Sequence, residues 1–202
     1  INLTGNISIP SSGTDNVCIG TWSSGNPDVG ERNVVIGKDA GNALNSNTDD
    51  VVLIGTNAGA TITAADSTAD HAVAIGSNAL GTIAKPLQCT AIGNVSQYQA
   101  STGTYNVSVG YESLYGKDTA VVSAYNVAVG TGAMKNADGT IAYNTAIGHH
   151  CMRDMDGGGN NIGIGHGTLL VVEGDYNVAV GNEAGDLIVG GDDNICIGHN
   201  AG

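Results

Sequence analysis

Four tyrosines are the residues whose type and spacing best suit them to hold a ligand. Each stands directly before the first position of a recurring short motif, and three of them fall in consecutive copies. They are Tyr105, Tyr125, Tyr143 and Tyr176. An exposed row of tyrosines can stack on sugar rings while its hydroxyls hydrogen-bond the sugar. A second interpretation has the rings pack at a corner of the fold against a neighbouring turn or chain. Both interpretations stay open, and these four are the predicted ligand-binding residues.

Metal binding is the second chemistry to weigh. His149, His166 and His199 each follow the glycine of the motif, so stacked imidazoles could bind a metal ion. Lys, Ser, Thr, Asn and Tyr hold the same place in other copies, which favours a solvated turn. The segment 154–160, Asp-Met-Asp-Gly-Gly-Gly-Asn, offers oxygen ligands but lacks the closing Glu of an EF-hand. We therefore expect a turn there, no metal site and no cofactor.

Catalysis would require a different constellation. A glycan-cleaving enzyme needs two carboxylates about 5–9 Å apart, for which Glu173 and Asp175 are candidates. An acidic repeat protein offers such pairs by chance, however. The chain contains neither a Gly-x-Ser-x-Gly elbow nor a nucleotide-binding loop. We expect no catalytic residues and no enzymatic activity.

The motif that must position these side chains is a pentapeptide ending in Ile-Gly or Val-Gly. Residues 126–130 (Asn-Val-Ala-Val-Gly) are typical, and eleven copies follow one another at intervals of 16 to 21 residues. The residue before Gly is always Ile or Val, and the residue three before Gly is Val, Ile or Thr. β-Branched residues two positions apart, followed by glycine, favour a short strand over a helix.

This repeat predicts a β-solenoid of about eleven rungs, with stacked strands about 4.8 Å apart. We expect the Ile/Val pairs to form a narrow core, and the small residues between them to face outward against other copies of the chain. The motif Gly supplies a backbone conformation or close approach that a Cβ would obstruct. The motif Asn, present in eight copies, is expected to form a hydrogen-bonded ladder at one corner. Inserts such as 61–70 and 118–123 are expected to be loops.

Composition and charge exclude several classes of protein. Six Lys and Arg against 19 Asp and Glu give a net charge of −13, which disfavours nucleic acid and anionic membranes as partners. A hydrophobic content of 41% excludes a disordered acidic tail. No apolar run is long enough for a membrane-spanning helix, so we expect no membrane insertion. The 32 Gly and the absence of Phe are unusual for a globular enzyme core.

The cysteines and the ends of the repeat complete the sequence-based picture. The four cysteines mostly take places that small residues hold elsewhere in the repeat, and we expect free thiols that act as small packing residues. They are Cys18, Cys89, Cys151 and Cys196. Residues 1–15 are expected to be a lead-in or cap, and residues 16–202 one solenoid domain. Because the chain begins with Ile, we expect it to be part of a longer protein.

Two stretches carry a resemblance to known families. Residues 125–133 (Tyr-Asn-Val-Ala-Val-Gly-Thr-Gly-Ala) and 176–184 (Tyr-Asn-Val-Ala-Val-Gly-Asn-Glu-Ala) resemble the head repeats of trimeric autotransporter adhesins. They are still more similar to the longer repeats of bacteriophage tail fibres, because the intervals here are less uniform than autotransporter heads usually keep. The resemblance covers about residues 16–202. It implies a left-handed β-roll, three chains packed side by side, and a role in surface attachment.

The sequence therefore predicts a homotrimeric section of a phage tail fibre or similar surface adhesin. Its partners would be its own copies and a host-surface glycan or receptor, and its location the virion tail or, alternatively, a bacterial cell surface. The main alternative is a purely structural, self-assembling shaft or filament without a ligand. A polysaccharide-depolymerising tailspike is less favoured. A flat solenoid that binds ice or mineral is disfavoured because regular Thr-x-Thr rows are missing.

Overall fold

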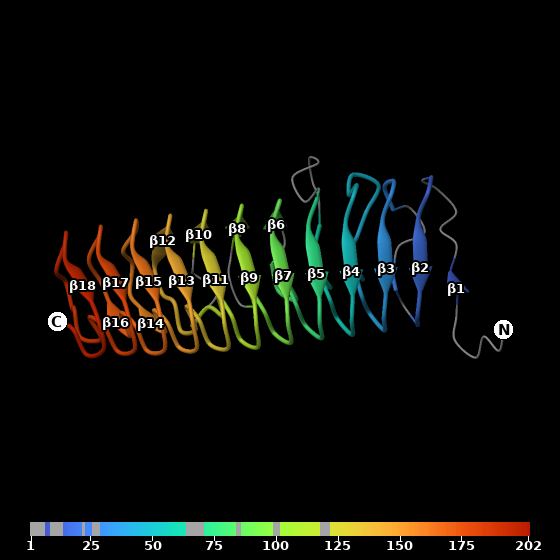
Figure 1. The fold of residues 1–202 in the computed structure, drawn as a ribbon. Coiled ribbons are helices and arrows are strands. Elements are labelled where there is room, and N and C mark those ends of the chain that lie inside the picture. Colours follow the sequence, from blue (N-terminus) through green and yellow to red (C-terminus); the bar gives the residue numbers. More distant parts are fainter. Residues whose placement is uncertain are drawn as a thin grey trace.

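Short strands stack along a rod in the computed structural model of the chain (Figure 1). The structure describes residues 7–8, 14–21, 23–25, 29–63, 71–83, 86–98, 102–117 and 122–202. Over these residues the fold is all-β without a helix, and it winds as a parallel β-solenoid of about nine turns. The predicted fold class is confirmed at this level. Since the described part has no helix, none of its segments is a helix that could cross a membrane.

One long sheet contains the motif strands. Within the described residues it has twelve strands, in the order β1-β2-β3-β4-β5-β7-β9-β11-β13-β15-β17-β18. Their bounds are β1 Ile7–Ser8, β2 Val17–Ile19, β3 Val34–Ile36, β4 Val52–Ile54, β5 Val73–Ile75, β7 Thr90–Ile92, β9 Val107–Val109, β11 Val127–Val129, β13 Thr145–Ile147, β15 Ile162–Ile164, β17 Val178–Val180 and β18 Ile195–Ile197. All neighbouring pairs from β2 to β18 are parallel and in register, so equivalent motif positions form columns along the rod.

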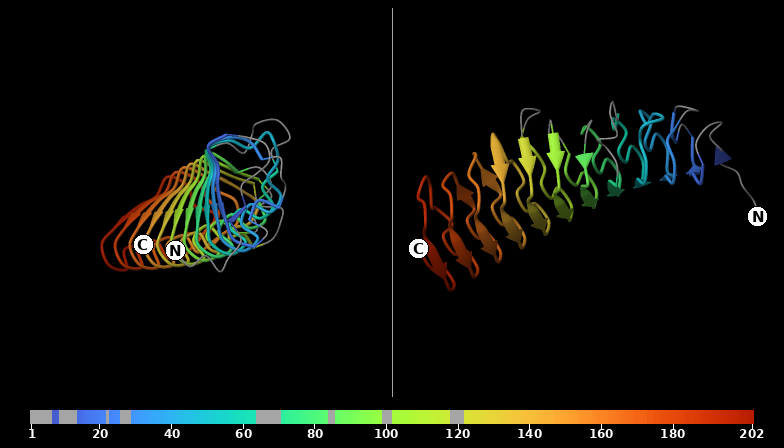
Figure 2. Two further views of the ribbon diagram at one scale, coloured as in Figure 1. Left: turned by 90° about the vertical axis from the view of Figure 1, so that its right-hand side faces the viewer. Right: turned by 90° about the horizontal axis from the view of Figure 1, so that it is seen from above.

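Two smaller parallel sheets form other sides of the turns. The described strands of the first are β6 Pro86–Leu87, β8 Thr102–Thr104, β10 Val122–Ala124 and β12 Thr140–Ala142. The second pairs β14 Asp154–Met155 with β16 Val171–Val172. Figure 2 shows the turns nearly superposed along the rod axis, each one slightly displaced from the last. Side chains at equivalent corners are therefore brought close together although they lie 16 to 21 residues apart in sequence.

The predicted lead-in and the predicted loops fall mostly outside the described residues. Of residues 1–15, the structure describes 7, 8, 14 and 15, and β1 pairs antiparallel with β2 at the edge of the long sheet. Of the inserts 61–70 and 118–123, it describes 61–63 and 122–123. The pairing of β1 places a strand against the first edge of the parallel stack, while β18 has a partner on one side within the described residues.

The prediction of which residues form the core was wrong. In each motif strand the middle residue is buried, and its two Val, Ile or Thr neighbours are partly or largely exposed. Ala128 is fully buried, whereas Ile147 and Ile164 each expose 40% of their surface. The small residues thus face the inside of the solenoid, and the β-branched pairs face out.

The narrow interior explains this inversion. The glycine turn folds the chain back so closely that little space remains beside the middle of the strand. A Cβ built on Gly163, the middle residue of β15, would lie 2.7 Å from Cys151 Sγ and 3.1 Å from Met152 Cε. Small residues at the middle of the strand and three positions after the motif Gly therefore suit this space. Alternation with a period of two does not show which face is the inner one.

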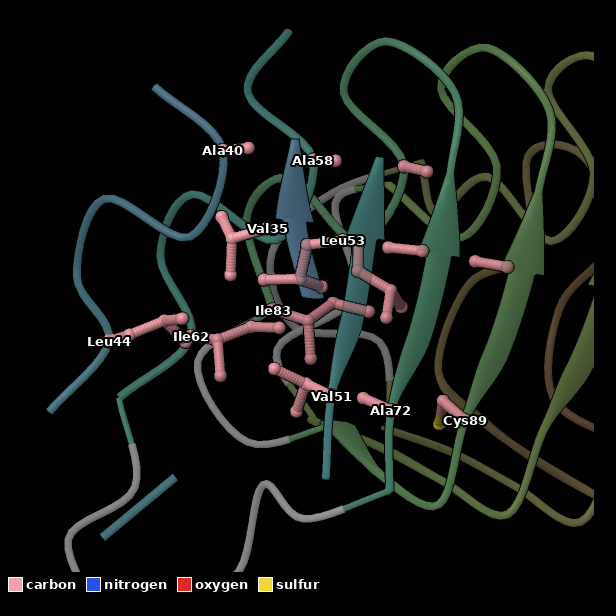
Figure 3. Packing of buried hydrophobic residues seen from close by; sticks show 14 of the residues in the cluster. Val35, Ala40, Leu44, Val51, Leu53, Ala58, Ile62, Ala72, Ile83 and Cys89 are labelled. Carbon is pink, nitrogen blue, oxygen red and sulfur yellow. The ribbon is translucent and has the colours of Figure 1, made fainter. Parts of the chain in front are cut away.

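Larger apolar side chains from the turns and return segments fill the rest of the interior. In the N-terminal half, Leu44, Ile62 and Ile83 pack beside the column of middle residues, as Figure 3 shows. In the C-terminal half, Met134, Met152 and Leu169 have the same role. The four cysteines are free and buried, as predicted. Burial raises the pKa of the Cys151 thiol to about 12.

The predicted asparagine ladder is confirmed. In the C-terminal half, the Oδ1 of each motif Asn accepts a hydrogen bond from the backbone N–H of the next, as between Asn144 and Asn161 at 2.9 Å. The Nδ2 groups donate to carbonyls of the return segment; that of Asn144 reaches Gly158 O at 3.1 Å. Where Cys89 replaces Asn, its Sγ donates to Gly103 O instead. These side chains are buried, so the ladder satisfies backbone groups that water does not reach.

Removing one step of this ladder is expected to be costly. In Asn144→Ala, the buried N–H of Asn161 and the carbonyl of Gly158 lose their partners. At 1–3 kcal/mol for each group, the free energy of unfolding should fall by about 2–5 kcal/mol. Urea denaturation measures this loss. The control is Asn182→Ala, at an exposed turn position, which should change stability by less than about 0.5 kcal/mol. Equal effects of the two substitutions would contradict a structural role for the ladder.

Candidate ligand-binding surface

One corner of the solenoid carries the predicted tyrosines, and every residue at that corner has the same backbone conformation. We call it the corner column: the residue directly before the first motif position in each copy. Its members are Asp15, Arg32, Asp50, His71, Gln88, Tyr105, Tyr125, Tyr143, Asn160, Tyr176 and Asp193. Their φ angles lie between 48° and 63°, in the left-handed region. Because residue types as different as Arg, Gln and Tyr share it, the conformation comes from the sharp turn between two sheets and not from any one side chain.

Three of the tyrosines stack on one another. The ring centroids of Tyr105 and Tyr125 are 4.9 Å apart with planes 7° from parallel, and those of Tyr125 and Tyr143 are 4.9 Å apart at 2°. This is an offset-stacked arrangement at the spacing of the turns. The corner packing considered as the second interpretation is therefore present. It leaves the rings accessible all the same, with exposed fractions of 39%, 47% and 58% along the row.

The stacking determines what the row can offer a ligand. Within the stack, the faces of Tyr125 are covered by its two neighbours, so the row presents ring edges and hydroxyls to solvent. Open ring faces remain at the ends of the stack. Tyr176 lies two turns beyond Tyr143, with Asn160 between them, and is 59% exposed. The structure thus brings three of the four predicted residues into contact and sets the fourth apart.

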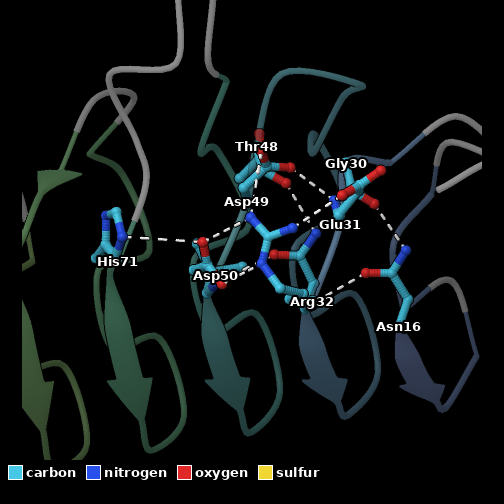
Figure 4. Close-up of polar contacts among 10 residues, drawn as sticks. Asn16, Gly30, Glu31, Arg32, Thr48, Asp49, Asp50 and His71 are labelled. Atoms are coloured by element: carbon cyan, nitrogen blue, oxygen red, sulfur yellow. Dashed lines mark hydrogen bonds and ion pairs between the residues drawn. The ribbon is translucent and has the colours of Figure 1, made fainter. Parts of the chain in front are cut away.

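The N-terminal part of the corner column holds charged side chains that the sequence analysis did not single out. Arg32 donates two hydrogen bonds to Asp50, at 2.7 and 2.9 Å, and His71 Nε2 lies 3.8 Å from Asp50 Oδ2 on the other side (Figure 4). The hydrogen bonds from Arg32 lower the pKa of the Asp50 carboxyl. The group is exposed, so it contributes little stability. The sequence feature that could have identified these three residues is their place directly before the first motif position.

The histidines do not gather into a metal site. His149 and His166 stack with centroids 5.2 Å apart, and His149 also stacks on His150 at 3.8 Å. Burial and neighbouring positive charges lower the pKa of His150. In the described part of the chain, no three His, Cys, Asp or Glu side chains are grouped so that they could hold a metal ion. His199 lies at an exposed turn position further along the rod.

Of the carboxylates considered for calcium or catalysis, Asp154, Asp156 and Glu173 line a hollow beside β14 and β16, and Asp175 does not. The Asp154 carboxylate accepts hydrogen bonds from Arg153 and Asn136, so internal partners already hold it. The Asp175 carboxylate accepts a hydrogen bond from Gly159 N of the preceding turn at 2.6 Å. The hollow has a volume of about 360 Å³ and is lined by Lys117, Asn136, Asp138, Asp154, Met155, Asp156, Val171 and Glu173. Glu173 thus faces the hollow, while Asp175 is used in backbone hydrogen bonding.

A second surface is defined by the outward residues of the long sheet. We call it the Val/Ile face: the first and third residues of the parallel strands from β2 to β18. Every member is Val, Ile or Thr, so the face carries no charge along the rod. With eleven strands about 4.8 Å apart and the two columns about 7 Å apart, it covers on the order of 350 Å². A typical monomer exposes a largest apolar patch of about this size, and such a patch often marks an interaction site.

Comparison of the chain with protein-family models, with curated protein sequences and with solved structures finds no match.

Proposed function

We propose that the chain is a segment of a homotrimeric fibre, of the tail-fibre or surface-adhesin type, which supports attachment to a host surface. In this proposal about eleven rungs form a left-handed roll, and three rolls pack side by side. The segment has no enzymatic activity. Its location is the virion tail or, alternatively, a bacterial cell surface. The resemblance of residues 16–202 to tail-fibre and adhesin repeats supports this assignment.

The observation that carries the proposal is the Val/Ile face. Ile147 and Ile164 are paired in register on adjacent strands, and each exposes 40% of its surface in the single chain. Removing this uncharged strip from water is favourable by about 25 cal/mol for each Å² of apolar surface that is buried. Copies of the same chain have the same spacing between strands, so their faces match turn by turn. Association through this face, and not through the small residues as the sequence suggested, buries the strip.

The corner column supplies the surface for attachment. It runs along the rod and keeps the tyrosine hydroxyls and the exposed ring edges in solvent in the single chain. Phenol groups both hydrogen-bond and make apolar contact, which suits the hydroxyl and C–H groups of a glycan. A shaft or filament without a ligand is the alternative that remains if this surface binds nothing.

Cell adsorption separates the adhesin from the plain shaft. The triple variant Tyr105→Ala, Tyr125→Ala, Tyr143→Ala is compared with the unchanged protein for adsorption to bacterial cells, both at the same verified oligomeric mass. We expect adsorption of the unchanged protein and at least a tenfold loss in the variant. Equal adsorption by both proteins would remove the tyrosines from the attachment role. If neither protein adsorbs to cells that the virion or bacterium bearing the fibre attaches to, the result favours a shaft without a ligand.

A further inference from the structure

The corner column contains a gap between two aromatic rings. Tyr143, Asn160 and Tyr176 occupy equivalent positions on three successive turns, with φ angles of 60°, 59° and 60°. Backbone hydrogen bonds link the turns in the same way, from Asn160 N to Ala142 O at 3.1 Å and from Tyr176 N to Gly159 O at 3.1 Å. Since the middle residue has a short side chain, no ring fills the space between the two tyrosines.

The size of this gap follows from the adjoining stack. Tyr125 is a six-membered ring held between Tyr105 and Tyr143 at 4.9 Å on each side. The rings of Tyr143 and Tyr176 are separated by two turns, about 10 Å. A single six-membered ring placed above Asn160 would therefore meet one tyrosine on each side, as Tyr125 does. A flat ring such as Tyr125 meets its neighbours at a centroid distance of 4.9 Å, whereas a puckered ring with axial C–H groups is thicker and contacts both tyrosine faces directly across the same spacing.

The polar surroundings favour a neutral, hydroxylated guest. Asn160 is exposed, and among the described residues no side-chain or backbone partner is recorded for its amide, which offers both a donor and an acceptor. Asp175 and Asp193 are exposed beside Tyr176, in a chain of net charge −13. Carboxylates accept hydrogen bonds from sugar hydroxyls and repel phosphates and acidic sugars.

We propose that Tyr143, Asn160 and Tyr176 form a binding slot for one neutral pyranose ring. The two tyrosine faces contact the C–H faces of the sugar, and the Asn160 amide hydrogen-bonds a hydroxyl at the base of the slot. The inference rests on the proposed attachment role and names the ligand class of that surface. All three residues belong to one chain, so the slot can bind whether or not the chain forms a trimer. A failure of one proposal is therefore distinguishable from a failure of the other.

Saturation-transfer NMR with small neutral glycosides tests the slot. The probes are methyl glucopyranoside, methyl galactopyranoside and methyl mannopyranoside, with methyl glucuronide as an anionic probe and p-cresol as an aromatic one. We expect transfer to the ring C–H protons of at least one neutral glycoside, with a dissociation constant on the order of millimolar. Binding of the glucuronide should be at least several-fold weaker.

Three variants make the test specific. Tyr176→Ala removes one wall and should weaken binding at least tenfold. Asn160→Tyr places a ring in the slot and continues the tyrosine stack, so it should abolish sugar binding while leaving the thermal midpoint unchanged or raised. Tyr111→Ala removes an exposed tyrosine that lies outside the corner column, directly after the motif glycine Gly110, and serves as the matched control, with binding retained. The proposal is overturned if no neutral glycoside binds, if Asn160→Tyr binds as well as the unchanged protein, or if p-cresol alone binds.

Discussion

Alanine in place of Gly110 is expected to lower the free energy of unfolding by about 3–5 kcal/mol. This loss is larger than the one expected for the same substitution at the motif glycine of the last turn. Gly110 has a φ of +140°, which strains any residue with a side chain. In addition, its new Cβ would lie 2.5 Å from Gly130 O and 2.7 Å from Gly130 C, both backbone atoms of the next turn. The contact can be relieved only if two turns move apart, which weakens the hydrogen bonds between them.

Gly198 provides the control that separates the clash from the strain. It holds the same motif place with a φ of +124°, but the nearest atom to a new Cβ is the Cβ of Ala201, 3.9 Å away. Gly198→Ala should therefore lose about 1–2 kcal/mol, from backbone strain alone. Urea denaturation of the two variants, monitored by circular dichroism, measures the difference between their free energies of unfolding. Equal losses of unfolding free energy in the two variants would show that the clash between stacked turns does not destabilise the fold.

Glutamate in place of Ile147 is expected to break the trimer. Ile147 lies on the Val/Ile face in β13, and its neighbour Ile164 in β15 continues the apolar strip. In the proposed trimer each chain would bring one carboxylate into the apolar interface, and a buried, unpaired charge costs several kcal/mol. Since about 1.4 kcal/mol is a factor of ten, the dissociation constant should rise at least a hundredfold.

The matched control for this charge is Thr140→Glu. Thr140 is exposed in β12, in the four-stranded sheet on another side of the same turn. Sedimentation velocity at micromolar concentration should find the Ile147 variant as single chains and the Thr140 variant as trimers. Retained circular dichroism in both would show that the roll itself still folds. Dissociation of both variants, or of neither, would contradict association through the Val/Ile face.

Much of the fold could be predicted because the repeat constrains it at several positions at once. The motif residues 127–129 form a strand, its glycine lies against the next turn, and Asn126 and Asn144 are linked by hydrogen bonds. Each of these follows from a local requirement: β-branched residues for an extended strand, glycine for a left-handed and crowded turn, and a buried amide for unpaired backbone groups. The free, buried cysteines follow from the same register.

The inner and outer faces could not be predicted from the same pattern. Val127 and Val129 alternate with Ala128, and larger apolar residues are ordinarily the buried ones. Here Ala128 is buried and its neighbours are not, because the middle position of the strand faces the narrow interior, where most copies have a small residue and β3 and β4 have Val35 and Leu53. That constraint comes from the distance across the turn, which depends on backbone geometry and not on hydrophobicity.

The candidate site was only partly visible in the sequence. The tyrosines were identified because one residue type recurs before the motif Asn, but their mutual stacking depends on how closely successive turns superpose. Asn160 and the Arg32–Asp50 pair share that place and were missed, since their residue types differ from Tyr. A column defined by position, with no regard to residue type, would have included them.

The oligomeric mass in solution tests the central claim most directly. Multi-angle light scattering on the purified chain, coupled to size-exclusion chromatography, gives this mass without reference to shape, which matters for a rod. The account predicts three times the 20.1 kDa of one chain at micromolar concentration. A single species with the mass of one chain would contradict the homotrimeric fibre, and the Val/Ile face would then have no partner among copies of this chain.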